Sequence, residues 1–145
     1  MENINSLIEE IAQTVFDNVP VDRWNKVIVN VAMLTTYVEL TATYYVDDVK
    51  GKSFDANYIG APDSKMIDNL FIDLRKAMYA LTPEMGAWFN AEMTINSGKF
   101  SMTYDYDHKP DFEMTPEDKE FLIDAKEFPR NAVSTPAWLK YIING

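Results

Sequence analysis

A run of carboxylates between residues 105 and 113 is the main candidate in this sequence for acid–base or metal chemistry. Its acids are Asp105, Asp107, Asp111 and Glu113, and it also contains His108, the only histidine of the chain. Because side chains repeat every second residue along a strand, we expect Asp105 and Asp107 to point to the same face. The cluster fits a metal site, an acid–base pair or an acidic surface.

The catalytic and metal interpretations lack supporting motifs. The segment has no Gly-punctuated calcium loop, and no second group of ligands is placed elsewhere in the sequence. His108 lies in the turn-like segment DHKPD, and the sequence specifies no nucleophile beside it. Cysteine is absent, which excludes disulfides, thiolate metal sites and cysteine nucleophiles. We therefore predict no catalytic residue, no metal ligand and no cofactor, and we favour a solvated acidic surface.

One enzymatic alternative stays open. Glu92 and Asp105 could form the two-carboxylate arrangement of a glycosidase, although any acidic sheet face offers such a pair. A carboxylate- or metal-dependent hydrolase using this strand face is thus the alternative function. Calorimetric titration with Mg²⁺, Mn²⁺ and Ca²⁺ distinguishes it, because a binding protein needs no specific metal uptake.

The charge of the chain restricts its partners. The net charge is −10 and the isoelectric point is about 4.4, so direct binding to nucleic acid or to an anionic membrane is not expected. A protein with a basic surface is the complementary partner. The first ten residues, MENINSLIEE, carry acids where a signal peptide carries Lys or Arg, which predicts a cytoplasmic location. Asn30 and Glu39 interrupt the most apolar stretch, so we expect no membrane span.

The 145 residues are the size of one domain, and we place no boundary within 1–145. Apolar residues at helical spacing predict a helix over 4–17 and a second one that starts at 62–64 and ends at Leu81. Alternating apolar residues predict strands over 27–33 and 38–44, joined by a turn at Thr35-Thr36. A turn over 47–53 and a third strand over 54–58 follow.

A second hairpin is predicted around a turn at Ser97-Gly98. This register pairs Ile95 with Phe100 on the apolar face and continues to Phe89 with Tyr106. Thr115 is the expected N-cap of a third helix that Pro129 ends, and residues 136–145 form a packed helical turn. The order α-β-β-β-α-β-β-α indicates an α+β fold, with an antiparallel sheet of about five strands and helices on one face.

The other sheet face is the predicted binding surface. Its central residues, in the register above, are Trp88, Asn90, Glu92, Asp105 and Asp107. The acidic rim is expected to contain Asp111, Glu113, Glu117 and Asp118. An exposed Trp88 among acids has the composition of a protein-binding hot spot, and the alternative is that the C-terminal segment covers it.

One block of the sequence resembles a known family. The segment SGKFSMTYDYD is similar to the signature strand of the YezG-like immunity (antitoxin) family, in which Gly-Lys-Phe leads into a strand ending in Tyr-Asp-Tyr-Asp. The opening IEEIAQTVFDNVPVDRWNKVIVNVAM also resembles that family's first helix, its proline–tryptophan step and its first strand. The likeness spans about Asn5 to Phe128, and only Gly98–Asp107 is specific. The later segment TPEDKEFLIDAKEF departs from the family's Trp- and Tyr-rich helix.

The resemblance implies a small cytoplasmic protein that binds a secreted or contact-delivered bacterial toxin domain, commonly a nuclease. We expect a non-enzymatic immunity protein that occludes a basic toxin in a 1:1 complex. A general acidic interaction domain, for instance one that adds a strand to a sheet edge, is the remaining alternative.

Overall fold

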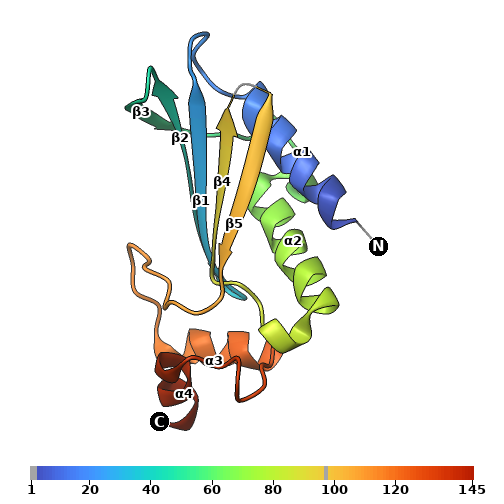
Figure 1. Ribbon diagram of the computed structural model, residues 1–145, viewed down its shortest axis with the longest axis vertical. Helices are drawn as coiled ribbons and strands as arrows, with labels where there is room; N and C mark the ends of the chain where they lie inside the picture. The colour runs from blue at the N-terminus through green and yellow to red at the C-terminus, as the bar shows by residue number, and fades with distance from the viewer. Residues whose placement is uncertain (1–2, 97) are drawn as a thin grey trace.

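A computed structural model describes residues 3–96 and 98–145, and within them five strands form one antiparallel sheet in the order β3-β2-β1-β4-β5 (Figure 1). The elements in chain order are α1 (Ile4–Asp17), β1 (Lys26–Leu34), β2 (Tyr37–Val46), β3 (Val49–Phe54), η1 (Asp63–Lys65), α2 (Ile67–Leu81), η2 (Pro83–Met85), β4 (Asn90–Asn96), β5 (Lys99–Asp105), α3 (Asp118–Glu127) and α4 (Ala137–Asn144). The predicted α+β class and antiparallel sheet are confirmed.

The helices form two groups. α1 and α2 cover one face of the sheet, whereas α3 and α4 lie across the end of the sheet (Figure 1). The main core lies between the sheet and the first pair, and it includes Leu7, Ile11, Val29, Phe71 and Met93. A second, smaller core at the end of the sheet contains Leu34, Phe89, Phe112, Phe121, Leu139 and Ile142.

The two predicted hairpin registers are confirmed over most of their length. β1 pairs with β2 from Met33–Val38 to Val27–Tyr44, as the apolar pattern requires. β4 pairs with β5 from Ile95–Phe100 to Asn90–Asp105. The turn of the second hairpin was predicted at Ser97-Gly98, and Ser97 lies outside the described residues.

The third strand lies earlier than predicted, at Val49–Phe54 in place of 54–58. The turn before it is short because Asp47 and Asp48 both adopt positive φ values, 51° and 64°, which allow a two-residue hairpin turn. Gly51 is therefore a strand residue. A Cβ added there would lie 2.4 Å from Cε1 of Tyr44, so close packing explains the glycine.

The predicted exposure of Trp88 is wrong. The β4–β5 ladder ends at Asn90–Asp105, and the Phe89 N–H donates to the Asp105 carbonyl at 2.8 Å, one residue out of the predicted register. This offset, of the kind found in β-bulges, removes the predicted Phe89–Tyr106 and Trp88–Asp107 pairs. Trp88 is 1% exposed in the main core, 5.9 Å from the Tyr104 ring, and Phe89 enters the second core.

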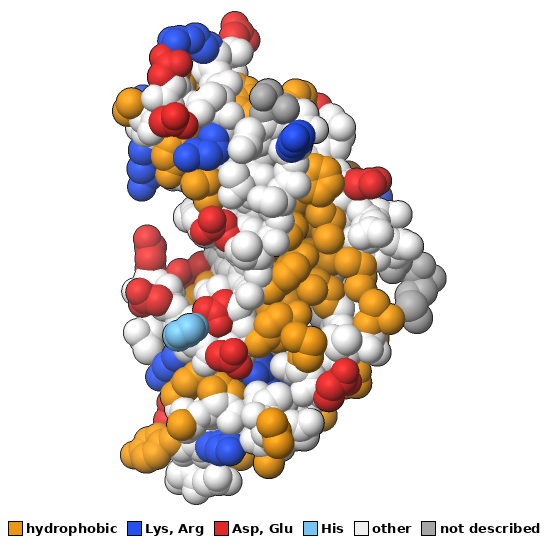
Figure 2. Space-filling model, viewed as in Figure 1, with side chains coloured by type: hydrophobic (Ala, Val, Ile, Leu, Met, Phe, Trp, Pro, Cys, Tyr) orange, Lys and Arg blue, Asp and Glu red, His pale blue; other side chains and the backbone are white. Residues whose placement is uncertain are grey.

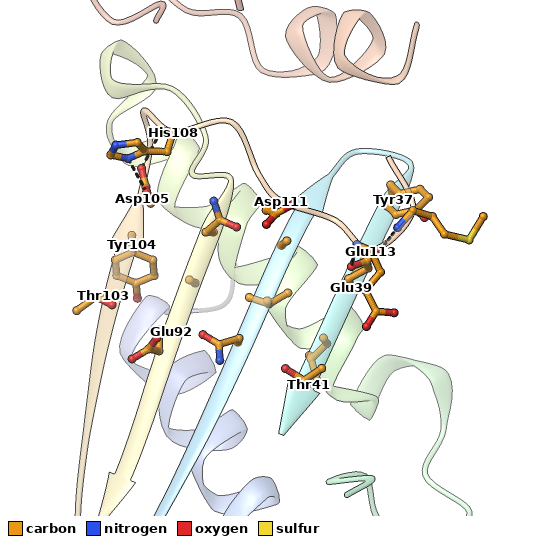
Figure 3. Close-up of a pocket in the computed structure, with 18 residues that line it drawn as sticks. Tyr37, Glu39, Thr41, Glu92, Thr103, Tyr104, Asp105, His108, Asp111 and Glu113 are labelled. Atoms are coloured by element: carbon orange, nitrogen blue, oxygen red, sulfur yellow. Dashed lines mark hydrogen bonds and ion pairs between the residues drawn. The ribbon is translucent and has the colours of Figure 1, made fainter. Parts of the chain in front are cut away.

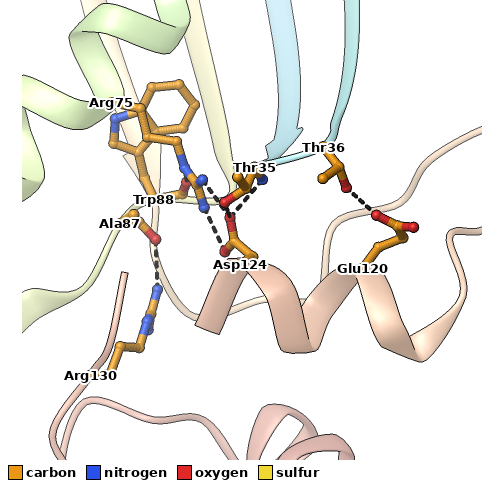
Figure 4. A network of polar contacts seen from close by, with 8 residues as sticks. All are labelled: Thr35, Thr36, Arg75, Ala87, Trp88, Glu120, Asp124 and Arg130. Atoms are coloured by element: carbon orange, nitrogen blue, oxygen red, sulfur yellow. Dashed lines mark hydrogen bonds and ion pairs between the residues drawn. The ribbon is translucent and has the colours of Figure 1, made fainter. Parts of the chain in front are cut away.

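A buried ion pair joins the two cores. Nη1 and Nη2 of Arg75 on α2 lie 2.7 and 3.0 Å from the two carboxylate oxygens of Asp124 on α3 (Figure 4). The Arg75 Nε donates to the Trp88 carbonyl at 2.7 Å, and Asp124 also accepts from the N–H and hydroxyl of Thr35. This clamp connects α2, the β1–β2 turn, the start of the β4 segment and α3.

The third helix starts at Asp118, after an N-cap at Glu117, so the predicted start at Thr115 is wrong. Thr115 and Pro116 belong to the preceding loop. The C-terminal helical turn is confirmed as α4, which contributes Leu139 and Ile142 to the second core.

Candidate functional site

The outer face of the sheet holds a groove of about 970 Å³ (Figure 3). It lies at the end of the sheet near α3, on the face that α1 and α2 leave uncovered. Its lining, as far as the described residues show it, includes five carboxylates and one histidine but no Lys or Arg. The five acids are Glu39, Glu92, Asp105, Asp111 and Glu113.

Two rows of cross-strand neighbours form the floor. One row runs Thr41, Asn30, Glu92 and Thr103 across β2, β1, β4 and β5. The next row runs Glu39, Ala32, Asn90 and Asp105 in the same strand order. Since adjacent strands lie about 4.8 Å apart, Glu39 and Asp105 stand roughly 14 Å apart at the two ends of their row. The acids are thus spread across the groove.

A loop over residues 106–117 forms the wall. The carboxylate of Glu39 accepts hydrogen bonds from the N–H groups of Glu113 and Met114, at 2.9 and 3.4 Å. Phe112 enters the second core and packs edge-to-face on Tyr37, with ring centroids 4.9 Å apart. The loop is therefore fixed over β1 and β2 (Figure 3), with Asp111 and Glu113 close to the floor.

Asp105 organises the turn at the end of β5. Its carboxylate accepts the N–H groups of Asp107 and His108, both at 3.0 Å, and lies 2.9 Å from Nδ1 of His108. Partial burial raises the pKa of Asp105, but these hydrogen bonds outweigh the burial and hold the pKa below its ordinary value of 3.8. Asp105 is therefore an anion throughout the physiological pH range.

Tyr104 contributes no charge to the groove. Burial raises its pKa to about 12, with a smaller contribution from Tyr106. The phenol therefore stays neutral at physiological pH, and the carboxylates set the charge of the site.

The structure brings together five of the nine predicted site residues. Asn90, Glu92, Asp105, Asp111 and Glu113 line the groove. Asp107, Glu117 and Asp118 are exposed but do not line it. The fourth residue outside the site is Trp88, which is buried. Trp88 belongs to the main core, whereas the C-terminal helix packs in the second core, and its Trp138 Nε1 donates to the Asp107 carbonyl at 2.6 Å.

Of the five carboxylates that line the groove, Glu39 is the one that the sequence prediction missed. Its position between Val38 and Leu40 was a usable signal, because alternation places it on the same outer face as Asn30 and Glu92. Finding it also required the order β2-β1-β4-β5, which makes both hairpins contribute to one surface.

This arrangement suits several cationic groups better than one ion. Ionised carboxylates spread over roughly 14 Å can each meet a separate Lys or Arg side chain. Among residues 3–96 and 98–145, no group of three or more His, Asp or Glu side chains is arranged to hold a metal ion. In Figure 2 the acidic side chains gather around the hollow next to the histidine.

No helix in the described ranges combines the length and apolarity needed to cross a membrane. The chain matches no protein-family model and shows no significant match to a curated protein.

Proposed function

We propose that this chain is an immunity protein that neutralises a bacterial toxin domain by binding the toxin's basic surface in the acidic groove. The observation that carries the proposal is the groove itself, whose described lining has five carboxylates and no Lys or Arg. The protein acts in the cytoplasm, binds one toxin per chain and performs no chemistry on it.

Charge complementarity supports a basic protein partner. The net charge of −10 attracts a basic partner from a distance, and the groove offers separate contacts for Lys and Arg side chains at close range. A nuclease is the favoured toxin class, because a domain that binds a polyanion presents a basic cleft. The resemblance of Gly98–Asp107 to the YezG-like signature strand supports the same class of function.

The groove has two kinds of carboxylate, which allows a clean experiment. Glu39 and Asp105 hold backbone N–H groups, so their replacement would also disturb the wall and the turn. Glu92 and Asp111 line the groove and are exposed, and neither accepts one of these bonds. The test variant is therefore Glu92→Lys with Asp111→Lys.

A matched control reverses two acids on the opposite face. Glu9 on α1 and Asp73 on α2 are exposed, and Glu9→Lys with Asp73→Lys changes the net charge by the same amount. Each protein is co-expressed with the C-terminal domain of the protein encoded by the upstream reading frame. Growth, co-purification and association rate are measured, and circular dichroism confirms folding.

We expect the unmodified chain and the control to rescue growth and to co-purify with the toxin domain. The groove variant should associate at least about tenfold more slowly at low salt and fail to rescue. Equal rescue by both double variants would overturn the assignment of the groove. An upstream domain that is not toxic, or that does not bind the unmodified chain, would overturn the immunity function.

A further inference from the structure

The two edges of the sheet are built differently. The β3 edge carries Lys50 and Lys52, and its pairing with β2 shifts register between Thr43 and Tyr45. Lysines and register irregularities are devices that keep an edge strand from pairing with another chain. The β5 edge has neither between Phe100 and Tyr104, and its pairing with β4 is regular from Asn96–Lys99 to Asn90–Asp105.

The apolar face of β5 is also incompletely covered. Phe100 is 45% exposed, and Met102 and Tyr104 are half-buried. Figure 2 shows apolar side chains in a strip between β5 and the helices α1 and α2. A free edge and an open apolar strip therefore lie side by side.

The β5 sequence, KFSMTYD, is complementary to itself when reversed. When two such strands pair in antiparallel fashion about Met102, each aromatic residue faces an aromatic residue and each hydroxyl faces a hydroxyl. Each charged residue faces a residue of opposite charge. The facing residues are Lys99 with Asp105, Phe100 with Tyr104, Ser101 with Thr103, and Met102 with itself. Opposite charges, aromatic pairs and hydroxyl pairs are the cross-strand neighbours that stabilise antiparallel ladders.

We propose that β5 is a homodimerisation strand, which pairs with β5 of a second copy and joins the two sheets into one. The symmetry is a two-fold axis through Met102, perpendicular to the sheet, and the contact is isologous. This operation keeps both helix layers on the same side, so the two apolar strips face each other. Both grooves open on the opposite side.

The dimer changes the end of each groove. Lys99 of the second copy lies opposite Asp105, which lines the groove. A cation from the second copy thus stands at the edge of a site whose described lining has no Lys or Arg of its own. Dimerisation does not depend on the identity of the groove's partner.

Self-complementarity favours a second copy over an unrelated strand. Nothing requires an unrelated strand to carry a Lys opposite Asp105 or an aromatic residue opposite Phe100. A second copy of β5 carries both at these positions. One strand pair is a small interface, so we expect a weak dimer with a dissociation constant on the order of micromolar.

The first test is sedimentation over a wide concentration range, with a charge exchange between copies. Lys99→Glu alone should weaken the dimer about tenfold, since it replaces two attractions by two repulsions. Asp105→Lys should do the same. A mixture of the two variants should recover dimers, because the carboxylate introduced at position 99 of one chain then faces the ammonium introduced at position 105 of the other. The unchanged Asp105 and Lys99 of the two chains face each other at the opposite end of the strand pair.

The second test fixes the register and does not rely on Asp105. The chain contains no cysteine, so introduced thiols give no background. Ser101→Cys and Thr103→Cys chains, when mixed under mild oxidation, should form a mixed disulfide at least about fivefold faster than either chain alone, because directly facing residues lie within disulfide reach and diagonal ones do not. Ser53→Cys on the β3 edge, mixed with Thr103→Cys, is the matched control.

A sedimentation result that shows only monomer up to high concentration would overturn the proposal. So would a dimer that persists unchanged with Lys99→Glu, or disulfides that form equally fast with Ser53→Cys. If the chain stays monomeric while Lys99→Glu weakens binding of the toxin domain, the edge receives an unrelated strand and the homodimer is wrong.

Discussion

Asp105 combines a structural and an electrostatic role within one side chain. It holds two backbone N–H groups of the turn and contributes negative charge to the groove. The same hydrogen bonds that shape the turn lower the pKa of Asp105, so local structure and the charge of the site depend on each other.

This coupling predicts how acid affects Asp105→Asn. A carboxylate whose folded pKa is depressed stabilises the protein above its unfolded pKa, and this stabilisation is lost as the pH falls through the lower folded pKa. The unmodified chain should therefore exceed Asp105→Asn in stability at pH 7, and the difference should shrink below about pH 4. Urea unfolding at pH 7 and pH 3 measures the difference. Asp111→Asn is the control. If it loses stability relative to the unmodified chain with the same pH dependence, the hydrogen bonds of the Asp105 turn are not the cause of the effect.

At the residue scale, sequence reasoning succeeded where alternation along a strand decides the outcome. Asn90, Glu92 and Asp105 lie on the outer face because the hairpin register forces them there. It failed at Trp88, because one out-of-register hydrogen bond at Phe89 ends the alternation and no side-chain pattern announces that bond. Glu39 was missed because its neighbours in the groove come from another hairpin.

Among the elements, α3 is joined to the rest of the fold by the buried Asp124, which has several partners, by Glu120, which accepts from the Thr36 hydroxyl, and by Phe121 in the second core. Asp124 is 5% exposed and binds Arg75 through both oxygens, while also capping the Thr35 turn. The Arg75 guanidinium also lies over the Phe128 ring, 4.8 Å from its centroid. Periodicity predicts that Arg75 and Asp124 belong to helices, but it cannot predict that the two helices meet.

Removal of one partner should be costly. Asp124→Ala leaves the buried Arg75 unpaired, and we expect a loss of roughly 3–5 kcal/mol in the free energy of unfolding. Urea denaturation followed by circular dichroism measures it. Glu127→Ala, an exposed change on the same helix, should alter stability by no more than about 0.5 kcal/mol. A similar small effect for Asp124→Ala would show that the ion pair does not hold α3.

The elements also show where composition misleads. The run DDVKGKS contains turn-forming residues, yet only Asp47 and Asp48 form the turn, and Gly51 lies in β3. The glycine is needed because the Tyr44 ring occupies the space of a side chain. A contact between two strands, rather than backbone flexibility, determines that residue.

For the whole molecule, charge and shape act at different distances. In the proposed function, the net charge of −10 would govern the encounter with a basic partner, and the groove would govern the final contacts. The fold class and most strand pairing could be predicted because apolar residues alternate clearly. The groove could not be predicted from the sequence, because its wall depends on a hydrogen bond between Glu39 and the backbone of a loop 74 residues away.

Long-range attraction predicts a salt-dependent association rate. Raising the salt concentration from about 0.05 to 0.5 M should slow association with the toxin domain by at least tenfold and change the dissociation rate far less, because screening acts on the encounter. Stopped-flow fluorescence measures both rates. The Glu9→Lys, Asp73→Lys control should show a smaller salt slope but the same dissociation rate. A salt-independent association rate would exclude electrostatic steering.

The wall of the groove has a further consequence for the lifetime of the protein. The loop 106–117 is continuous with β5 at one end and with α3 at the other, and the Arg75–Asp124 clamp holds α3. An opening of that clamp together with loss of the Glu39 and Phe112 contacts would release the wall, α3 and α4 as one cooperative unit while the five strands stay paired. Amide hydrogens in this unit should then exchange with a common free energy below that of global unfolding. A partner that spans floor and wall would close this route, so the unbound protein would be the form that proteases degrade first.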